Sequence, residues 1–497
     1  MPTNIKNVFV LMLENRSFDH MLGFSGISGI DAATGQATTI NGLQGTESNS
    51  YQGQLYLVAP AADDTMPIDP GHEFLDVVKQ LCGENTAYSV GGPYPPINNS
   101  GFVADYANSP SASQGEGNAP NNLGEIMKCF SPEQLPVLNA LATAFAVCDN
   151  WHASIPGPTW PNRLFACGAS SAGLDHSPTT GEMVTWETLD GFEFPQGSIF
   201  DALHRKFPDT GWRVYAGDHF PMAAALKGIE ILEVSSLNDF TRDVTSTTYP
   251  FLYTWIEPNY GDTLHDTYRG GNSQHPMDDV TPGEALIKAV YEAIRNSPHW
   301  DTSLLIVTWD EHGGFYDHIA PPTAVPPGDT PVGDKFNQYH FAFDRYGVRV
   351  PAVVVSPLVP AKVIDHRLYD HSSIPKAIET LFGLTALTER DAAANDVVAL
   401  LTLPTPRADA PMTLPNPAAP AMPKVALAAL QDDANVDRGN LPGFLHIAMR
   451  ADIAISPPEA KHSILSRVQG IQTRRQAAQY IQEVQARVQA AKVNGHP

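Results

Sequence analysis

The sequence predicts an α/β protein whose core is a mostly parallel β-sheet flanked by helices. Several short apolar runs have the composition of buried central strands, and helical patterns lie between some of them. This alternation of strands and helices favours a sheet that is covered on both faces. The length of 497 residues is sufficient for one large domain or two, with a substantial core.

The expected strands, in chain order, are Val8–Leu13, Ala144–Cys148, Trp212–Tyr215, Leu304–Thr308 and Val350–Val355. We expect all of them to be central strands of the parallel sheet. The clearest helical pattern is TPGEALIKAVYEAIRNS. We expect Thr281 to be its N-cap, Pro282 to take the first helical position and Glu284 to complete a capping box.

The composition divides the chain into three parts. Residues 1–400 are expected to form the main domain. Residues 401–458 begin with many prolines and are expected to form an extended linker and an irregular segment. Residues 459–497 have apolar residues at helical spacing and predict an amphipathic helix, which would pack on the body or on a second subunit. Contact with a membrane surface is the alternative for this helix.

Charge and composition exclude several classes of partner. The formal net charge of −24 argues against nucleic acids and strongly anionic membranes, which bind clustered Lys and Arg. No apolar run reaches the roughly 18 residues that a membrane-spanning helix needs. The N-terminus lacks the features of a cleaved signal peptide, so we expect a cytoplasmic protein or one exported by another route. The four cysteines have no metal-binding spacing, and we expect free thiols.

Two of the expected strands end in clusters of ionisable residues. The first strand is followed by Glu14 and Asn15, and Asp310 and Glu311 follow the fourth. The carboxyl ends of parallel strands share one edge of a sheet, so these side chains can converge. Three carboxylates in a small space require a cation, and oxygen ligands suit Ca²⁺, Mg²⁺ or Mn²⁺. The simpler alternative is that Glu14 caps a helix and the two acids flank a turn.

A metal-bound phosphoester needs a nucleophile, positive charge near the phosphoryl oxygens and an acid for the leaving group. The loop IPGPTWPNR offers the hydroxyl of Thr159 in a rigid turn, and Arg163 as a phosphate-binding cation. His72 of GHEF and His275 of QHP are candidate acids, because imidazole titrates near neutral pH. A loop threonine that caps a turn and histidines with structural roles are the alternatives.

These motifs resemble those of a known family. In order along the chain they are ENRSFDHMLGF, PTWPNR, QHPMDD followed by GEALIKAVYEAI, DEHGGFYDH, and YGVRVPAVVVSP. They are similar to the motifs of the phosphoesterase family, which contains bacterial phospholipases C, plant non-specific phospholipases C and certain bacterial acid phosphatases. The similarity runs from about residue 5 to residue 384 and includes YDHSSIPKAIE. Gln274 departs from the family pattern, which often has an acidic residue or a histidine before HP.

The resemblance implies an alkaline-phosphatase-like fold with the active site at the strand ends. It implies one divalent metal ion, for which Ca²⁺ is our first choice and Zn²⁺, Mg²⁺ and Mn²⁺ are the alternatives. Thr159 matches the nucleophile, His72 and His275 match histidines that serve the phosphoryl or leaving group, and His318 matches a supporting residue at the phosphate. The implied metal ligands are Glu14, Asn15, Asp310, Glu311 and Thr159.

We therefore expect a metal-dependent phosphoesterase that hydrolyses a phosphatidylcholine-like diester through a phosphothreonine intermediate. Thr in PTWPNR and Asp-Glu in DEHGG are closer to the phospholipase C members than to the phosphatases. An acid phosphatase that acts on monoesters is the alternative within the family. A non-catalytic, metal-containing binding protein is the alternative from another class. The expected partner is a phosphoester, with no nucleic acid, and the C-terminal helix offers a surface for a homo-oligomer.

Overall fold

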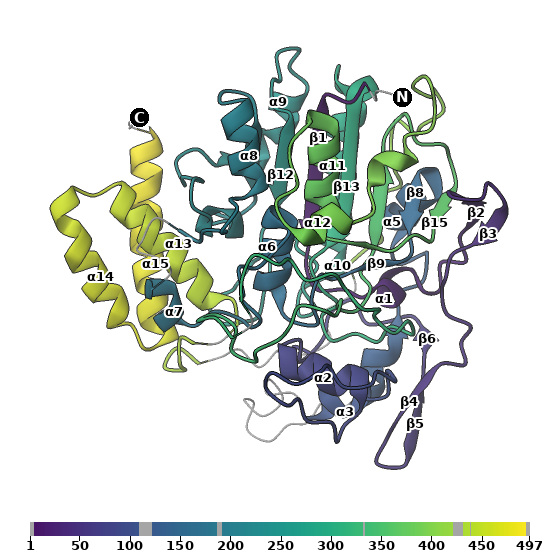
Figure 1. Cartoon of the computed structure of the whole chain (residues 1–497), viewed down its shortest axis with the longest axis horizontal. Coiled ribbons are helices and arrows are strands. Elements are labelled where there is room, and N and C mark those ends of the chain that lie inside the picture. Colours follow the sequence, from purple (N-terminus) through teal and green to yellow (C-terminus); the bar gives the residue numbers. More distant parts are fainter. Residues whose placement is uncertain are drawn as a thin grey trace.

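The computed structural model describes residues 4–108, 122–185, 191–331, 333–420, 431–437 and 439–493. Within these residues, ten strands form one central sheet (Figure 1). In spatial order they are β11 (Ser235–Ser236), β10 (Trp212–Ala216), β12 (Tyr253–Glu257), β1 (Asn7–Leu13), β13 (Ser303–Trp309), β14 (Ala352–Val355), β8 (Ala146–Cys148), β15 (Val363–Asp365), β2 (Ser28–Asp31) and β3 (Ala37–Thr39). The predicted α/β class with a mostly parallel sheet is confirmed.

The direction of one central strand differs from the prediction. Strands β1, β8, β10 and β13 run parallel as expected, but β14 is antiparallel to both of its neighbours, β13 and β8. The expectation that Val350–Val355 belongs to the parallel set is therefore wrong. The described residues between β13 and β14 form no helix that crosses the sheet. The chain thus re-enters the sheet from the edge at which β13 ended, and a parallel direction would require a crossover.

Helices cover both faces of the sheet (Figure 1). One face carries α5 (Pro136–Ala144), α9 (Phe240–Val244) and α10 (Val280–Arg295), and α10 contacts both of the others. The other face carries α6 (Thr159–Gly168), α8 (Ile199–Lys206) and α11 (Ser373–Phe382), and α6 contacts both of the others. Buried strands between two helical layers explain why runs such as NVFVLML are apolar throughout.

Helix α10 begins earlier than the sequence predicts, so Thr281 is not its N-cap. Asp279 is the N-cap, and its carboxylate accepts a hydrogen bond from the backbone N–H of Thr281. Glu284 does not complete a capping box. Its carboxylate accepts hydrogen bonds from the backbone N–H groups of Val137 (2.7 Å) and Leu138 (2.9 Å) at the start of α5. The Glu284 carboxylate therefore caps the neighbouring helix α5. The local sequence around Glu284 cannot predict this interaction, because α5 is distant in sequence.

A second, smaller group of elements, which we call the lower lobe, lies beside the carboxyl ends of the parallel strands (Figure 1). It has its own apolar core. Helix α1 (Phe18–Leu22) follows β1 and leads toward it. The lower lobe contains the hairpin β4 (Ser48–Tyr51) and β5 (Gln54–Leu57), the paired β6 (Ala59–Pro60) and β7 (Lys128–Cys129), α2 (Phe74–Cys82), α3 (Phe102–Ala107) and the 3-10 helix η1 (Leu123–Met127).

The C-terminal part of the chain forms helices that pack on the body. We call α13 (Leu441–Ala454), α14 (Lys461–Gln469) and α15 (Arg474–Val493) the C-terminal helices; they lie beside α7 (Thr180–Thr185) (Figure 1). Helix α13 lies within the segment predicted to be irregular. The single helix predicted over 459–497 is divided at Gly470–Thr473, and its last residues lie outside the described part. The predicted apolar positions, including Val468, Val484 and Val488, are buried.

The remaining elements are short. They are β9 (Trp151–His152), β16 (Tyr369–Asp370), α12 (Glu389–Ala393), and the 3-10 helices η3 (Met222–Ala225), η4 (Leu237–Asp239), η5 (Trp300–Thr302), η6 (Val397–Leu400) and η7 (Pro458–Ala460). In the described ranges, no helix has both the length and the apolar character needed to cross a membrane. The four cysteines are buried free thiols, as the sequence predicts.

Candidate active site

The structure brings two of the predicted strand ends together. Strands β1 and β13 are neighbours in register, with Leu13 opposite Trp309, so the residues that follow them lie at adjacent points of the sheet edge. The backbone N–H of Asn15 donates to Oδ1 of Asp310 at 3.2 Å and ties the two ends together. The side chains buried at this edge are Glu14, Asn15, Asp310 and Glu311.

Asn15 contacts both the second acidic cluster and the candidate nucleophile. Its φ of 55° is in the left-handed region, which asparagine tolerates better than most residues. Its Nδ2 donates to Oγ1 of Thr159 at 3.2 Å and also contacts Oε1 of Glu311. Gly313 is required here, because a Cβ at this position would lie 2.2 Å from the Asn15 carbonyl oxygen. Gly313, the first glycine of DEHGG, thus allows the backbone that follows Glu311 to pass close to the backbone of Asn15.

Thr159 is the first residue of α6, and its side chain is buried. The preceding turn is held by Asn162, whose Oδ1 accepts from the N–H of Ile155 at 3.0 Å. Nδ2 of Asn162 donates to the carbonyl oxygens of Gly157 (2.9 Å) and Pro158 (3.0 Å). The hydroxyl therefore lies at the positive end of a helix dipole, a place that favours an anionic group.

Arg163 pairs with a carboxylate of the cluster, and its predicted contact with phosphate stays a prediction. Its Nε donates to Oδ2 of Asp310 at 2.8 Å, and its Nη2 donates to the carbonyl oxygen of Leu13 at 3.1 Å. Burial raises the pKa of Asp310 to about 6, although the guanidinium opposes this rise. Of the three guanidinium nitrogens of Arg163, Nη1 has no hydrogen-bond partner in the described residues. In the structure the guanidinium offsets the negative charge of Asp310.

The cluster contains buried oxygen atoms that accept no hydrogen bond from the described residues. They are both carboxylate oxygens of Glu14 and Oδ1 of Asn15. Burial raises the pKa of Glu14 well above its ordinary value; Arg163, whose Nη2 is 4.0 Å from Oε1, only partly opposes this. Buried oxygens of this kind are costly unless a donor or a cation satisfies them. These oxygen donors therefore fit a hard divalent cation.

The two predicted histidines lie beside each other at the same site. The ring centroids of His72 and His275 are 6.3 Å apart. Burial alone lowers the pKa of His72, but Glu311, Asp69 and other acids outweigh this and raise it to about 10. Burial lowers the pKa of His275 well below its ordinary value, and the positive His72 adds to this effect. At neutral pH the site thus pairs a cationic His72 with a neutral His275.

His318 belongs to a different cluster. Its Nδ1 is 2.6 Å from Oδ2 of Asp19, and its Nε2 is 3.3 Å from Oδ1 of Asn41. Asp19, Asp317 and His318 lie close enough together to suggest a metal site. However, Arg349 already donates to Oδ1 of Asp19 at 2.9 Å and to Oδ1 of Asp317 at 2.9 Å. The ring is committed to this ion-pair cluster, and its predicted contact with phosphate stays a prediction.

Several residues near the site were not predicted as functional. Oδ1 of Asp69 lies 3.7 Å from Nε2 of His275. The sequence feature that could have indicated a place for Asp69 at the site is its position three residues before His72. His371, in the quoted motif YDHSS, contacts the carbonyl oxygen of Asp310 through Nε2 at 2.6 Å. Gln274, the departure from the family pattern, is turned away from the cluster: its Oε1 accepts from Nε1 of Trp309 at 3.0 Å.

The C-terminal helix α13 also contacts residues next to the site. Nδ2 of Asn440 donates to the hydroxyl of Tyr268 at 3.0 Å. The Tyr268 ring stacks on His275 with the centroids 3.4 Å apart. One turn along α13, a Cβ on Gly443 would lie 1.8 Å from the ring of Trp160, the neighbour of Thr159. These contacts join segments far apart in the chain, so no local sequence pattern predicts them.

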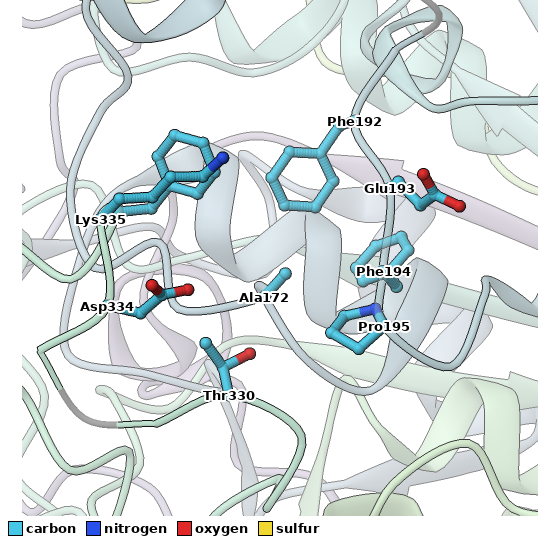
Figure 2. A pocket seen from close by; sticks show the side chains of 9 residues that line it. Ala172, Phe192, Glu193, Phe194, Pro195, Thr330, Asp334 and Lys335 are labelled. Carbon is cyan, nitrogen blue, oxygen red and sulfur yellow. The ribbon is translucent and has the colours of Figure 1, made fainter. Parts of the chain in front are cut away.

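Two cavities lie away from these residues. One has a volume of about 220 Å³ and is shown in Figure 2. Phe192, Phe194 and Pro195 lie on one side of it, and Asp334 and Lys335 lie on the other. Ala172, which also lines it, follows the carboxyl end of α6, whereas Thr159 begins that helix. The second cavity is lined by residues of 180–181, 433–437 and 469–473. Neither contains a predicted site residue.

A mostly parallel α/β sheet with buried polar residues at its strand ends is the arrangement that the comparisons with known proteins place in a family of ester hydrolases. The chain belongs to the Phosphoesterase family, whose model matches residues 5–385. Members of this class hydrolyse phosphoric esters. The resemblance in the sequence motifs is thereby confirmed.

Relatives with curated names are phospholipases C. The chain is 39% identical over 437 residues to non-specific phospholipase C6 of Arabidopsis thaliana, covering 83% of this chain and 75% of the relative. It is 28% identical over 462 residues to phospholipase C B of Mycobacterium tuberculosis, covering 85% and 82% of the two chains. A solved structure from Vibrio parahaemolyticus, described as an alkaline phosphatase superfamily protein, covers 77% of this chain and 76% of its own, at 13% identity and a TM-score of 0.32. Because this TM-score is low, we assign the fold class from the observed strand order and helical layers and not from this similarity.

Proposed function

We propose that the protein is a metal-dependent phosphoesterase of the phospholipase C type, which hydrolyses a phosphatidylcholine-like diester through a phosphothreonine intermediate. The observation that carries this proposal is the hydrogen bond between Thr159 and Asn15, at the helix N-terminus and beside buried, unsatisfied oxygens. The phospholipase C names of the relatives support the substrate class. An acid phosphatase acting on monoesters is the second candidate, because it needs the same nucleophile and metal site.

The residues that would hold the metal ion are Glu14, Asn15, Asp310, Glu311 and Thr159, with Ca²⁺ as our first choice. When bound, a divalent ion supplies Lewis-acid chemistry, which lowers the pKa of a coordinated hydroxyl and offsets phosphoryl charge. Glu14 and Asn15 present the free oxygens for it. Asp310 contributes mainly by holding Arg163 and the backbone of Asn15 in place.

The side chains of the site divide the remaining chemistry between them. Thr159 gives its hydroxyl proton to the neutral His275 as its oxygen attacks phosphorus, so that a Thr–O–P bond forms while the bond from phosphorus to the glycerol oxygen breaks. The cationic His72 donates its proton to the departing alkoxide, because its raised pKa keeps it protonated at neutral pH. In the second step His72, now neutral, accepts a proton from the attacking water, and His275 returns its proton to the Thr159 oxygen as the Thr–O–P bond breaks. Water releases the phosphorylated head group and restores Thr159.

Two substrates tested side by side separate the candidate functions. Purified protein is assayed with p-nitrophenylphosphorylcholine, a diester, and with p-nitrophenyl phosphate, a monoester, each with Ca²⁺ and with chelator. Faster turnover of the diester that chelator abolishes supports the phospholipase C assignment. Preference for the monoester favours the acid phosphatase. No turnover of either substrate with any divalent ion favours the non-catalytic binding protein.

A further inference from the structure

The hairpin β4–β5 of the lower lobe presents an exposed apolar face. The strands are joined at Gln52 (φ 48°) and Gly53 (φ 79°), which suits a tight hairpin turn. Leu55 is 58% exposed and Leu57 is 53% exposed. Because side chains alternate along a strand, these two leucines share one face while Tyr56 packs toward the lobe's core. We call the face that carries Leu55 and Leu57 the outer face of the hairpin.

Two sequence segments at the hairpin carry no charged side chains. Residues 48–62 contain no Asp, Glu, Lys, Arg or His, and neither do residues 85–104. The two segments touch, since Nδ2 of Asn49 donates to the carbonyl oxygen of Asn99 at 2.9 Å. Leu57 and Leu55 pair across the hairpin with Ser48 and Ser50. In a chain with a net charge of −24, such an uncharged surface matches an electroneutral partner and not a charged one.

The hairpin belongs to the lobe that supplies part of the candidate active site. His72 directly precedes α2 of the lower lobe. The lobe lies beside the carboxyl ends of the parallel strands, and the hairpin projects from it (Figure 1). Exposed apolar residues on a hairpin that projects from this lobe mark a surface suited to contact with an apolar partner.

We propose that the outer face of the hairpin docks the enzyme on an electroneutral phospholipid surface, with Leu55 and Leu57 entering the interfacial region. This inference rests on the proposed phospholipase C function. Burial of the two leucines in the acyl boundary supplies the affinity. A zwitterionic membrane has no net charge and therefore does not repel the acidic protein, whereas an anionic membrane would.

The test is cosedimentation of the full-length protein with sucrose-loaded phosphatidylcholine vesicles, in chelator so that no lipid is hydrolysed. Leu55→Gln/Leu57→Gln is expected to lower the partition coefficient at least about tenfold, because two half-exposed leucines lose their transfer into lipid. With Ca²⁺, turnover of the water-soluble p-nitrophenylphosphorylcholine is expected to stay within about twofold of wild type, while turnover of vesicle lipid falls.

Met412→Gln is the matched control. Met412 is 55% exposed, and its carbonyl oxygen accepts from Asn296 just beyond the end of α10, far from the lower lobe. This variant is expected to partition like the wild type. Leu55→Trp gives a second measurement, in which tryptophan emission shifts to the blue when vesicles are added.

The proposal is overturned if the double variant partitions like the wild type, if Met412→Gln loses as much, or if the Trp emission does not shift. Dimerisation that the double variant abolishes, with unchanged vesicle binding, would assign the face to a second copy of the chain. Failure of the proposed function is distinct, because it would appear as no turnover of the soluble diester while vesicle binding persists.

Discussion

At the scale of single residues, the carboxylate of Glu14 is the least satisfied group in the site. Both of its oxygens are buried, and burial raises its pKa more than Arg163 and the Ser273 hydroxyl lower it. We therefore expect Glu14→Gln to raise the melting temperature of the metal-free protein, because a neutral amide removes the buried charge. The same variant should lose the thermal stabilisation that Ca²⁺ gives the wild type. Differential scanning fluorimetry with and without Ca²⁺ measures both. A lower melting temperature in chelator would contradict this account of Glu14.

Asp310 and Glu311 are expected to respond differently to the same change. Asp310→Asn leaves the buried guanidinium of Arg163 without its counter-charge, which costs about 3–5 kcal/mol of folding free energy. Glu311→Gln keeps an oxygen to accept from the N–H of Gly313 and should cost much less. Urea unfolding in chelator compares the two variants. Equal losses would show that the Arg163–Asp310 pair is not the structural element proposed here.

The residues at the strand ends could be predicted from the sequence because their positions depend on local pattern. An apolar run that stops at Glu14, and another that stops before Asp310, indicate strand ends on one sheet edge. The partner of Asp310 could not be predicted. Arg163 is 147 positions away, and its own motif is equally compatible with phosphate binding. Whether Arg163 pairs with Asp310 depends on how deeply its guanidinium is buried, and only the packed structure defines that burial.

At the scale of elements, α13 holds one side of the active site. Asn440 donates to Tyr268, which stacks on His275. Asn440→Ala should lower kcat for the soluble diester about tenfold with little change in KM, because His275 loses its fixed orientation but the substrate contacts remain. The pH dependence of kcat should also shift. Asn435→Ala is the control, because in the described residues that side chain accepts a hydrogen bond from the backbone N–H of Asp437 in the same loop. Equal effects of the two variants would contradict a positioning role.

A second prediction concerns the stability of the segment around α7. His176 contacts Asp175 through Nδ1 at 3.0 Å and Glu182 through Nε2 at 3.0 Å. Burial alone lowers the pKa of His176, but its bonds to these two acids outweigh this and raise it to about 9. The raised pKa gives stability that is fully present below about pH 6.5 and is lost as the pH rises through 9.

The difference in unfolding free energy between the wild type and His176→Gln should therefore shrink by up to about 3 kcal/mol between pH 6 and pH 10. Urea unfolding at a series of pH values measures this difference. Comparing the two proteins at each pH removes the contribution of other titrating groups. A difference that is constant, or that grows with pH, would contradict the assignment.

Element boundaries show where sequence patterns stop being sufficient. The helix around 281–295 was predicted, but its N-cap is Asp279, and Glu284 is used by α5. The strand at 350–355 was predicted, but its direction depends on the route of a long loop. The helical periodicity of the last residues was visible, whereas the turn at 470–473 and helix α13 were not foreseen. Each difference arises from packing between segments that are distant in sequence.

At the scale of the whole molecule, the candidate active site is assembled from segments that are distant from one another in the sequence. The sheet supplies Glu14 and Asp310, the lower lobe supplies His72, and α13 supports His275 from outside the matched family region of 5–385. The order of the motifs along the chain was sufficient to identify the family. It could not predict that α13 supports His275, because that contact joins segments that are distant in sequence. Oligomerisation through the C-terminal helices stays a prediction.

The central claim is that Thr159 forms the covalent intermediate, and one measurement tests it most directly. The wild type is mixed with excess p-nitrophenylphosphorylcholine, quenched in acid within the first turnovers and examined by peptide mass spectrometry, beside Thr159→Val whose Ca²⁺ binding has been measured. We predict a phosphorylcholine adduct on Thr159 in the wild type, and neither adduct nor turnover in the variant. Most of the wild-type turnover in a Thr159→Val protein that binds Ca²⁺ normally would contradict the account.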